Sequence, residues 1–365
     1  MKAAFPFRWW EFTWYLIIFI FGTVGNLSVI LVILLNKTID AKSSFNILII
    51  VLAITDLLVS VVGLPIYYLS TSAYNHPDGQ RGDFLCMFFT GYFLPFFLLE
   101  VSVFILVLIA LGRRRAITNP LSILDDEQTW KKILPILMSV LLSLGLGIPT
   151  IFGLKYTPQN PMVGNHCTYR YTFINSIIIY CVVFFIDTIS PIVILVICFH
   201  HIRKSFNLTN KFLTASNSTK LRGNDVTLQK KQKSIDTMKL VVVVFFLCIL
   251  PNHLLYLMSL TGVEGLGWNT EISQVGVLIR FTNSCLNPLL YSLKSKRFRK
   301  NFRDTFPRCF NGPPKKLLFK KHGDVRGDGH ITIVMLTSQI RQRFAKWHEH
   351  TDLTYVVTAL ARIYR

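Results

Sequence analysis

Charged residues are scarce in this 365-residue chain, at 16% of the total. Soluble domains carry roughly 25% charged residues, so the composition argues against an ordinary soluble protein. Hydrophobic residues make up 52% and the mean hydropathy is +0.45, which favours a membrane protein. The sequence has no histidine cluster with metal-ligand spacing and no nucleophile motif, so it gives no support to an enzyme.

Three further absences narrow the class. No small-residue cleavage pattern follows the apolar run near the N-terminus, so we expect an uncleaved first helix rather than a signal peptide. No internal repeat or pair of broken helices is evident, although a transporter would be expected to show them. The seven cysteines, spread over a long chain, do not indicate a small disulfide scaffold.

Long apolar runs are what the sequence has in abundance. A helix that crosses a membrane needs about 20 mainly apolar residues, and seven stretches qualify: about 13–35, 45–70, 84–112, 132–154, 173–200, 239–261 and 273–293. Prolines and single charges within them are tolerated where neighbouring helices satisfy the backbone. One long polar linker is expected at about 201–238. The predicted fold class is an all-α membrane protein with a seven-transmembrane helix bundle over 13–293.

The basic residues predict the orientation of this bundle. If residues 1–12 are extracellular, 33 of the 39 Lys and Arg residues fall in the cytoplasmic segments. Basic residues gather on the cytoplasmic side of membrane proteins, so we expect a multi-pass plasma-membrane protein with a cytoplasmic C-terminus. The net charge of +20 then reflects that membrane face and not nucleic-acid binding.

A short amphipathic helix is expected directly after the seventh span, over residues 294–306. Phe298, Phe302 and Phe306 recur at intervals of four residues, and Lys and Arg occupy the other face. This pattern is typical of a helix that lies in the membrane interface. Residues 307–365 form a basic cytoplasmic tail suited to anionic lipid, and its last part resembles no family that we can place.

Six short motifs follow one another in the predicted spans. They are "GN" at 25–26, "LAITD" at 52–56, "GRRRAI" at 112–117, Pro191, "FFLCILP" at 245–251 and "NPLLY" at 287–291. Together they resemble the motifs of rhodopsin-like (class A) G-protein-coupled receptors over about residues 13–306. This resemblance implies an extracellular ligand and a heterotrimeric G protein as partners, and no enzymatic activity.

The resemblance assigns the activation residues. Arg113 stands in the place of the family's DRY arginine, and Tyr291 completes its NPxxY motif. Phe245, Pro251 and Pro288 match positions in the moving parts of spans six and seven. Since a proline in mid-helix removes a backbone hydrogen bond, it marks a place where a helix can kink.

Asp56 lies near mid-membrane, where a carboxylate is costly and therefore a functional candidate. The resemblance pairs it with the residues that bind an allosteric sodium ion in this family: Ser102, Asn283, Ser284 and Asn287. Oxygen ligands suit a hard cation. The alternative is a hydrogen-bonded polar cluster without an ion. No other cofactor is expected.

The family also implies a disulfide between Cys86 and Cys167, which both lie on the predicted outer side, where the compartment is oxidising. Two free thiols are the alternative. Cys86 stands 27 residues before Arg113, two more than the family pattern, so we expect a local bulge or a shift in register. Cys309, beyond the amphipathic helix, is either palmitoylated or a plain cytosolic thiol.

The upper halves of spans three, five, six and seven should line the ligand site. By position the candidates are Pro95, Leu98, Leu99, Glu100, Asp187, Asn252, His253, Tyr256 and Arg280. Three of them are charged inside the membrane, where ions are either paired or functional. Arg280 either forms an internal salt bridge with a carboxylate, or it receives a ligand carboxylate while Asp187 takes a cationic group.

Two family comparisons bear on the ligand. Phe281 stands where retinal-binding members carry a lysine, and Pro95 stands where amine receptors carry an aspartate, so no retinal is expected and an amine is disfavoured. The segment "LCILPNHLLYL" at 247–257 is similar to one found in neuropeptide receptors. A peptide is therefore favoured, with a small-molecule or lipid ligand as the alternative.

Departures from the family pattern affect the expected resting state. Gly112 replaces the acid beside the DRY arginine, and Arg114 replaces its tyrosine. Lys231 stands low in span six, where the family carries a second acid that holds the arginine in its resting position. We therefore expect raised basal signalling. Ile249 replaces the toggle tryptophan and Phe199 a tyrosine. A degenerate receptor that binds or traffics without G-protein coupling is the alternative.

Overall fold

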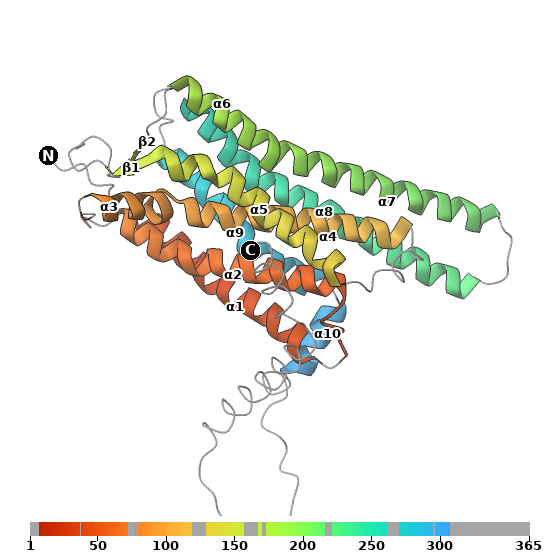
Figure 1. The fold of residues 1–365 in the computed structure, drawn as a ribbon. Helices are drawn as coiled ribbons and strands as arrows, with labels where there is room; N and C mark the ends of the chain where they lie inside the picture. The colour runs from red at the N-terminus through yellow and green to blue at the C-terminus, as the bar shows by residue number, and fades with distance from the viewer. Residues whose placement is uncertain are drawn as a thin grey trace, which may run out of the picture.

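The structure, a computed structural model, describes residues 7–36, 38–71, 77, 79–118, 129–156, 167–169, 173–215, 221–260, 270–294 and 296–306. Most of these residues are helical: α1 (Trp9–Leu35), α2 (Ser44–Thr71), α3 (Gln80–Leu85), the π-helix η1 (Cys86–Thr90), α4 (Phe93–Thr118), α5 (Thr129–Gly153), α6 (Phe173–Phe184), the π-helix η3 (Phe185–Ile189), α7 (Ser190–Ala215), α8 (Leu221–Leu260), α9 (Glu271–Lys294) and α10 (Lys296–Thr305). The long helices lie side by side as a bundle (Figure 1). The fold class is all-α, as predicted.

Within the described residues, five helical stretches are long and apolar enough to cross a membrane: Trp9–Leu35, Ser44–Ser70, Gln80–Thr118, Thr129–Gly153 and Ile174–Leu208. The apolar part of α8, Val243–Ser259, is shorter. Helix α9 is long but carries Arg280, Asn283, Ser284 and Asn287, which are all buried inside the bundle. Its polar side chains therefore contact other helices instead of lipid, as membrane helices require.

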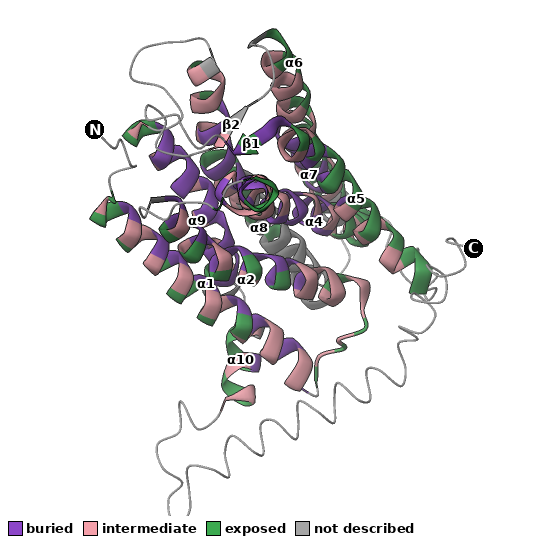
Figure 2. Cartoon of the chain, turned by 60° about the vertical axis from the view of Figure 1, so that its left-hand side comes forward, coloured by how far each residue is buried: buried purple, intermediate pink, exposed green. Residues whose placement is uncertain are grey.

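Helix α4 is the central element of the bundle and contacts α2, α5, α7 and α8. Its buried residues run from Phe93 to Ala110 and occupy every side of the helix. The outer helices are buried on one side only, and large apolar side chains such as Phe21 and Leu142 are exposed on the other. Figure 2 shows this contrast between inner and outer faces. An apolar exterior around a buried polar interior is the arrangement expected in lipid.

The third predicted span is not one continuous helix. A single turn of π-helix, η1, follows α3, and the chain breaks at Gly91 and Tyr92 before α4 begins. Tyr92 has a φ of 63°, a left-handed conformation that is unusual for a bulky residue. A Cβ on Gly91 would collide with the Cys86 carbonyl oxygen and with Leu154. This wide turn and break form a local bulge between Cys86 and Arg113, one of the two expected alternatives.

The fifth span contains a second π-helix, η3, between α6 and α7. A π turn inserts an extra residue into an α-helix and changes the direction of the side chains near it. Asp187 and Thr188 lie in this turn, and both are fully buried. The π turn thus directs Asp187 into the bundle interior.

The prediction of a linker at 201–238 is wrong for most of that range, which is helical. Helix α7 continues to Ala215, and α8 already begins at Leu221. A helix satisfies its own backbone hydrogen bonds, so it can continue into water after it leaves the lipid. The apolar pattern marked only the membrane-embedded parts of these two helices.

The amphipathic helix predicted at 294–306 is present as α10. The rings of Phe298, Phe302 and Phe306 succeed one another along one face of the helix. The buried Asn36 side chain, just beyond the end of α1, donates to the Asn301 carbonyl oxygen at 3.2 Å. This bond helps to hold α10 against α1 and α9. Figure 1 shows α10 beside the end of α1.

Candidate functional site

An ion pair between α9 and the π turn of span five lies in the bundle interior. Arg280 Nη2 donates to Asp187 Oδ2 at 2.8 Å, and both side chains are at most 5% exposed. Arg280 Nη1 lies 3.4 Å from Asn252 Oδ1 of α8, and the guanidinium carbon lies 5.1 Å from the centre of the Phe96 ring. The internal salt bridge, one of the two alternatives for Arg280, is therefore present.

His253 connects this ion pair to Tyr180. Its Nε2 atom lies 3.0 Å from both Asp187 Oδ2 and Arg280 Nη1. One ring nitrogen cannot both donate to the carboxylate and accept from the guanidinium, so each neutral tautomer satisfies only one of these contacts. On the other side of the ring, the Tyr180 hydroxyl lies 2.8 Å from Nδ1 and donates to the His253 carbonyl oxygen, also at 2.8 Å. The histidine thus has two alternative hydrogen-bonding arrangements.

A second carboxylate, Glu100, lies within the electrostatic reach of both Asp187 and Arg280 and is 6% exposed. Among the described residues, three buried polar atoms of this cluster have no hydrogen-bond partner: Glu100 Oε2, Asp187 Oδ1 and Arg280 Nε. Buried polar groups are usually satisfied, so such a group needs an explanation. The cluster holds two carboxylates and one guanidinium, which leaves acceptor capacity unused.

The other predicted ligand residues lie on α4 and α8. Pro95, Leu98, Leu99 and Asn252 are buried, and Tyr256 is half-buried. The rings of Tyr256 and Tyr180 lie 4.3 Å apart between their centres. The structure thus brings Glu100 of α4, Asn252 and His253 of α8 and Arg280 of α9 together around Asp187.

Sequence analysis missed two members of the cluster, Tyr180 and Phe96. Tyr180 stands seven residues before Asp187, which is two helical turns and therefore the same side of the helix. Phe96 directly follows the predicted Pro95. The spacing of Tyr180 was a usable signal, whereas the contact of Phe96 with Arg280 depends on how α4 and α9 pack.

Asp56 is fully buried in α2 and is bonded from two other helices. Ser102 Oγ donates to one carboxylate oxygen at 2.8 Å, and Asn287 Nδ2 donates to the other at 2.7 Å. Ser284 faces the same carboxylate from α9, and its hydroxyl is buried. Asn283 is buried nearby on α9. These oxygen donors fit a hard cation, and the sodium ion stays a prediction.

Phe281 and Ile249 are packing residues. Phe281, in the place of a retinal-binding lysine, is fully buried, and its ring contacts those of Tyr15 and Phe96. Ile249, in the place of the toggle tryptophan, is 1% exposed and belongs to the same buried core as Phe245. Phe199 packs against this core.

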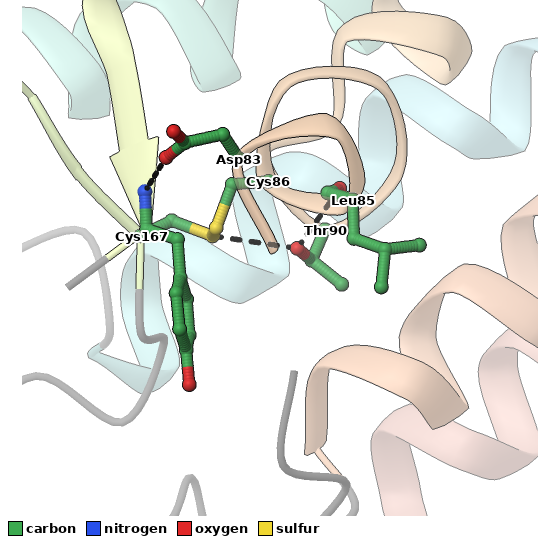
Figure 3. The surroundings of a disulfide bond; sticks show 6 residues. Asp83, Leu85, Cys86, Thr90 and Cys167 are labelled. Atoms are coloured by element: carbon green, nitrogen blue, oxygen red, sulfur yellow. Dashed lines mark hydrogen bonds between the residues drawn. A yellow bond between two sulfur atoms is a disulfide. The ribbon is translucent and has the colours of Figure 1, made fainter. Parts of the chain in front are cut away.

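A disulfide ties the start of the third span to a short hairpin. Strands β1 (Leu154–Tyr156) and β2 (Cys167–Tyr169) are antiparallel, with Tyr156 opposite Cys167. The predicted bond between Cys86 and Cys167 is present, and the Tyr156 amide donates to Asp83 Oδ1 at 2.7 Å (Figure 3). The hairpin is therefore fixed against α3 and η1.

At the opposite end of the bundle, the Arg113 guanidinium carbon lies 5.1 Å from the centre of the Phe45 ring. Gly112 is exposed, and a Cβ at this position would meet nothing within 4 Å. Pro251 and Pro288 lie inside α8 and α9 as predicted. The side chains of Lys231 and Tyr291, and all of Cys309, lie outside the part of the chain that the structure describes.

Comparisons with known proteins agree with this architecture. Residues 25–291 match the family described as 7 transmembrane receptor (rhodopsin family). The chain is 29% identical to galanin receptor 2a of Danio rerio over 80% of this chain and 77% of that protein. It is 26% identical to a QRFP-like peptide receptor of Branchiostoma floridae, over 81% and 76%.

A third similarity is to melanopsin-A of Danio rerio, at 24% identity over 89% of this chain and 54% of that protein. The family match covers well over half of the chain and includes all six motifs. It also covers Asp56, Asp187 and Arg280. The chain therefore belongs to the rhodopsin family of seven-transmembrane receptors, which are multi-pass membrane proteins and not enzymes.

Proposed function

We propose that this receptor binds an extracellular peptide at the Asp187–Arg280 cluster and activates a heterotrimeric G protein at the Arg113 end of the bundle. In this proposal the protein lies in the plasma membrane with an extracellular N-terminus and a cytoplasmic C-terminus. The positions of its basic residues support that orientation.

The observation that carries the proposal is the unused acceptor capacity of the buried cluster. Glu100 Oε2 and Asp187 Oδ1 have no hydrogen-bond partner among the described residues, while both Nη atoms of Arg280 are already in use. A cationic ligand group would balance the second carboxylate and satisfy these oxygens. Charge-assisted hydrogen bonds of this kind are about twice as strong as neutral ones.

A peptide is the ligand class that we favour. Two of the similar proteins are named as a galanin receptor and a QRFP-like peptide receptor, and peptides supply cationic side chains and N-termini. The half-buried rings of Tyr180 and Tyr256 lie between the cluster and the upper ends of α6 and α8. We propose that these rings separate to admit the ligand.

A peptide screen tests this proposal. Cells that express the full chain are treated with galanin, QRFP peptide and a library of short neuropeptides, with calcium and cyclic-nucleotide readouts. For an active peptide, Glu100→Gln should raise the half-maximal concentration about tenfold to a hundredfold, the loss expected for a hydrogen bond to a charged group. Glu271→Gln is the control, because this side chain is 71% exposed at the start of α9.

Two results would contradict the ligand proposal. The first is activation only by amines or lipids, which would assign the site to another ligand class. The second is an unchanged response of Glu100→Gln to an active peptide, which would show that this carboxylate does not contact the ligand.

Basal signalling should fall when the missing acid is restored by Gly112→Asp. A carboxylate beside Arg113 would hold the arginine in the resting position, and a Cβ at residue 112 would meet no atom within 4 Å. A gain of about 1 kcal/mol for the resting state would lower the active population about fivefold. GTP exchange on added G protein, measured in membranes without ligand, gives the readout.

Gly112→Asn is the matched control, because asparagine has the shape of aspartate without its charge. It should leave basal GTP exchange near the level of the unmodified receptor. If the unmodified receptor gives no more exchange than membranes without it, the proposed basal activity is wrong. No exchange even with an activating peptide would favour a receptor that binds without coupling.

A further inference from the structure

Arg113 contacts an aromatic ring of α2 at the cytoplasmic end of the bundle. Its guanidinium carbon lies 5.1 Å from the centre of the Phe45 ring, inside the limit of about 6 Å within which a ring face attracts a cation. Arg113 is half-buried and Phe45 is 36% exposed, so the contact is partly shielded from water. Partial shielding strengthens an attraction of this kind. The pair therefore links α4 to α2.

The turn between α1 and α2 fixes the position of Phe45. The side chain of Asn46, the next residue, donates to the Asp40 carbonyl oxygen at 2.7 Å. The amide of Lys42 donates to the Asp40 carboxylate at 3.0 Å, and the amide of Ser43 donates to the Asp40 carbonyl oxygen at 3.3 Å. Since these bonds close the turn on both sides of Phe45, a structured segment presents the ring to α4.

The neighbouring arginine contacts a different helix. Arg114 makes a hydrogen bond with the thiol of Cys198 in α7, which is fully buried. Successive residues of an α-helix are about 100° apart around its axis, so the side chains of Arg113 and Arg114 leave α4 in different directions. Helix α4 thus contacts α2 through one arginine and α7 through the next.

The Phe45 contact and G-protein binding use the same group of Arg113. A guanidinium whose face is covered by the ring cannot at the same time extend into a G protein. A two-state equilibrium shifts toward the state in which a contact is made, so the contact with Phe45 opposes coupling. Gly112 supplies no carboxylate that could do the same.

We propose that Phe45 is a positioning residue whose ring holds Arg113 against α2 in the resting receptor, in the role that Gly112 leaves unfilled. This role rests on the coupling function proposed above for Arg113. A cation–π contact at a partly exposed site is weaker than a hydrogen-bonded charge pair. The resting state is therefore secured only in part, which agrees with the raised basal signalling proposed above.

Fluorination of the Phe45 ring tests the electrostatic character of this contact. The full receptor is expressed by amber suppression with phenylalanines that carry increasing numbers of ring fluorines at residue 45. Fluorine withdraws electron density from the ring face and changes its size little, so basal GTP exchange should rise stepwise. The fully fluorinated ring and Phe45→Leu should reach about twofold to fivefold the exchange of the unmodified receptor, which corresponds to the loss of an exposed cation–π contact.

Two controls separate this electrostatic effect from packing. Phe45→Tyr keeps an aromatic face, so basal exchange should stay near that of the unmodified receptor. The same fluorinated residue at Phe21, a ring that is 60% exposed on the outer face of α1, should leave exchange unchanged.

Thermal melting without G protein separates the contact from the proposed coupling. Residues in contact give non-additive losses of stability. The melting temperature lost in Phe45→Leu should therefore be smaller in an Arg113→Gln background and unchanged in an Arg114→Gln background. Non-additive losses with no GTP exchange in any variant would support the contact and contradict the coupling proposed for Arg113.

Three results would overturn the role of Phe45. The first is additive melting losses for Phe45→Leu and Arg113→Gln. The second is measurable GTP exchange that stays equal across the fluorinated series. The third is lower exchange in Phe45→Leu than in the unmodified receptor, which would mean that the ring favours the active state.

Discussion

Replacing Arg280 with methionine is expected to lower the free energy of unfolding by about 3–5 kcal/mol, the range for breaking a buried ion pair by removing one partner. Methionine keeps most of the apolar volume of the side chain but leaves both Asp187 and Glu100 buried without a cation. Asp187 is fully buried and Glu100 is 6% exposed, so neither carboxylate reaches solvent.

Asp187→Asn should destabilise the receptor less than Arg280→Met. Arg280 retains Glu100 as a second carboxylate within electrostatic reach, whereas Asp187 and Glu100 have no other arginine or lysine in the described cluster. For the same reason, Glu100→Gln should recover part of the stability lost in Arg280→Met. This asymmetry distinguishes a three-member cluster from a simple ion pair.

Thermal melting of the purified receptor, compared across the single and double variants, measures these differences. Glu271→Gln is the control, since Glu271 pairs with Arg8 at 3.7 Å and is 71% exposed. A surface pair of this kind contributes about 0–1 kcal/mol. Equal losses of stability in Asp187→Asn and Arg280→Met would exclude a contribution of Glu100 to the electrostatics of the cluster.

The second large effect is expected from Cys86→Ser. The disulfide joins residues 81 positions apart and fixes the hairpin against the start of the third span. Loss of such a cross-link typically costs about 2–4 kcal/mol. The response to peptide should weaken as well, because the hairpin would no longer be held beside α3 and η1.

Cys167→Ser and the double variant should show the same loss as Cys86→Ser, because each of them removes the same bond. Cys181→Ser, which alters a free cysteine in α6, should have no comparable effect. A reducing agent should lower the melting temperature of the unmodified receptor to that of the variants and leave the variants unchanged. A larger loss in the double variant than in either single one would mean that the serines act through packing.

The sequence by itself determined the features that depend on local patterns. Apolar length predicted most of the membrane helices, and the four-residue spacing of Phe298, Phe302 and Phe306 predicted α10 almost to its ends. The motifs placed Asp56 beside Ser102 and Asn287 and paired Cys86 with Cys167 through the family resemblance, and the structure contains these contacts. Side-chain period and hydropathy are properties of neighbouring residues, so they can be read without the fold.

Partner choice in the interior was decided by the tertiary structure. Asp187 and Glu100 are both candidate partners of Arg280 by sequence. Only the arrangement of the helices brings Asp187, 93 residues away along the chain, within hydrogen-bond distance of Arg280. The packing of α4 and α9 likewise adds Phe96 to the cluster. Two π turns set the direction of the side chains near Cys86 and Asp187, and no local sequence pattern predicted these turns. Which charges meet in a membrane interior depends on the rotation and register of whole helices, and these are fixed only when the helices pack together.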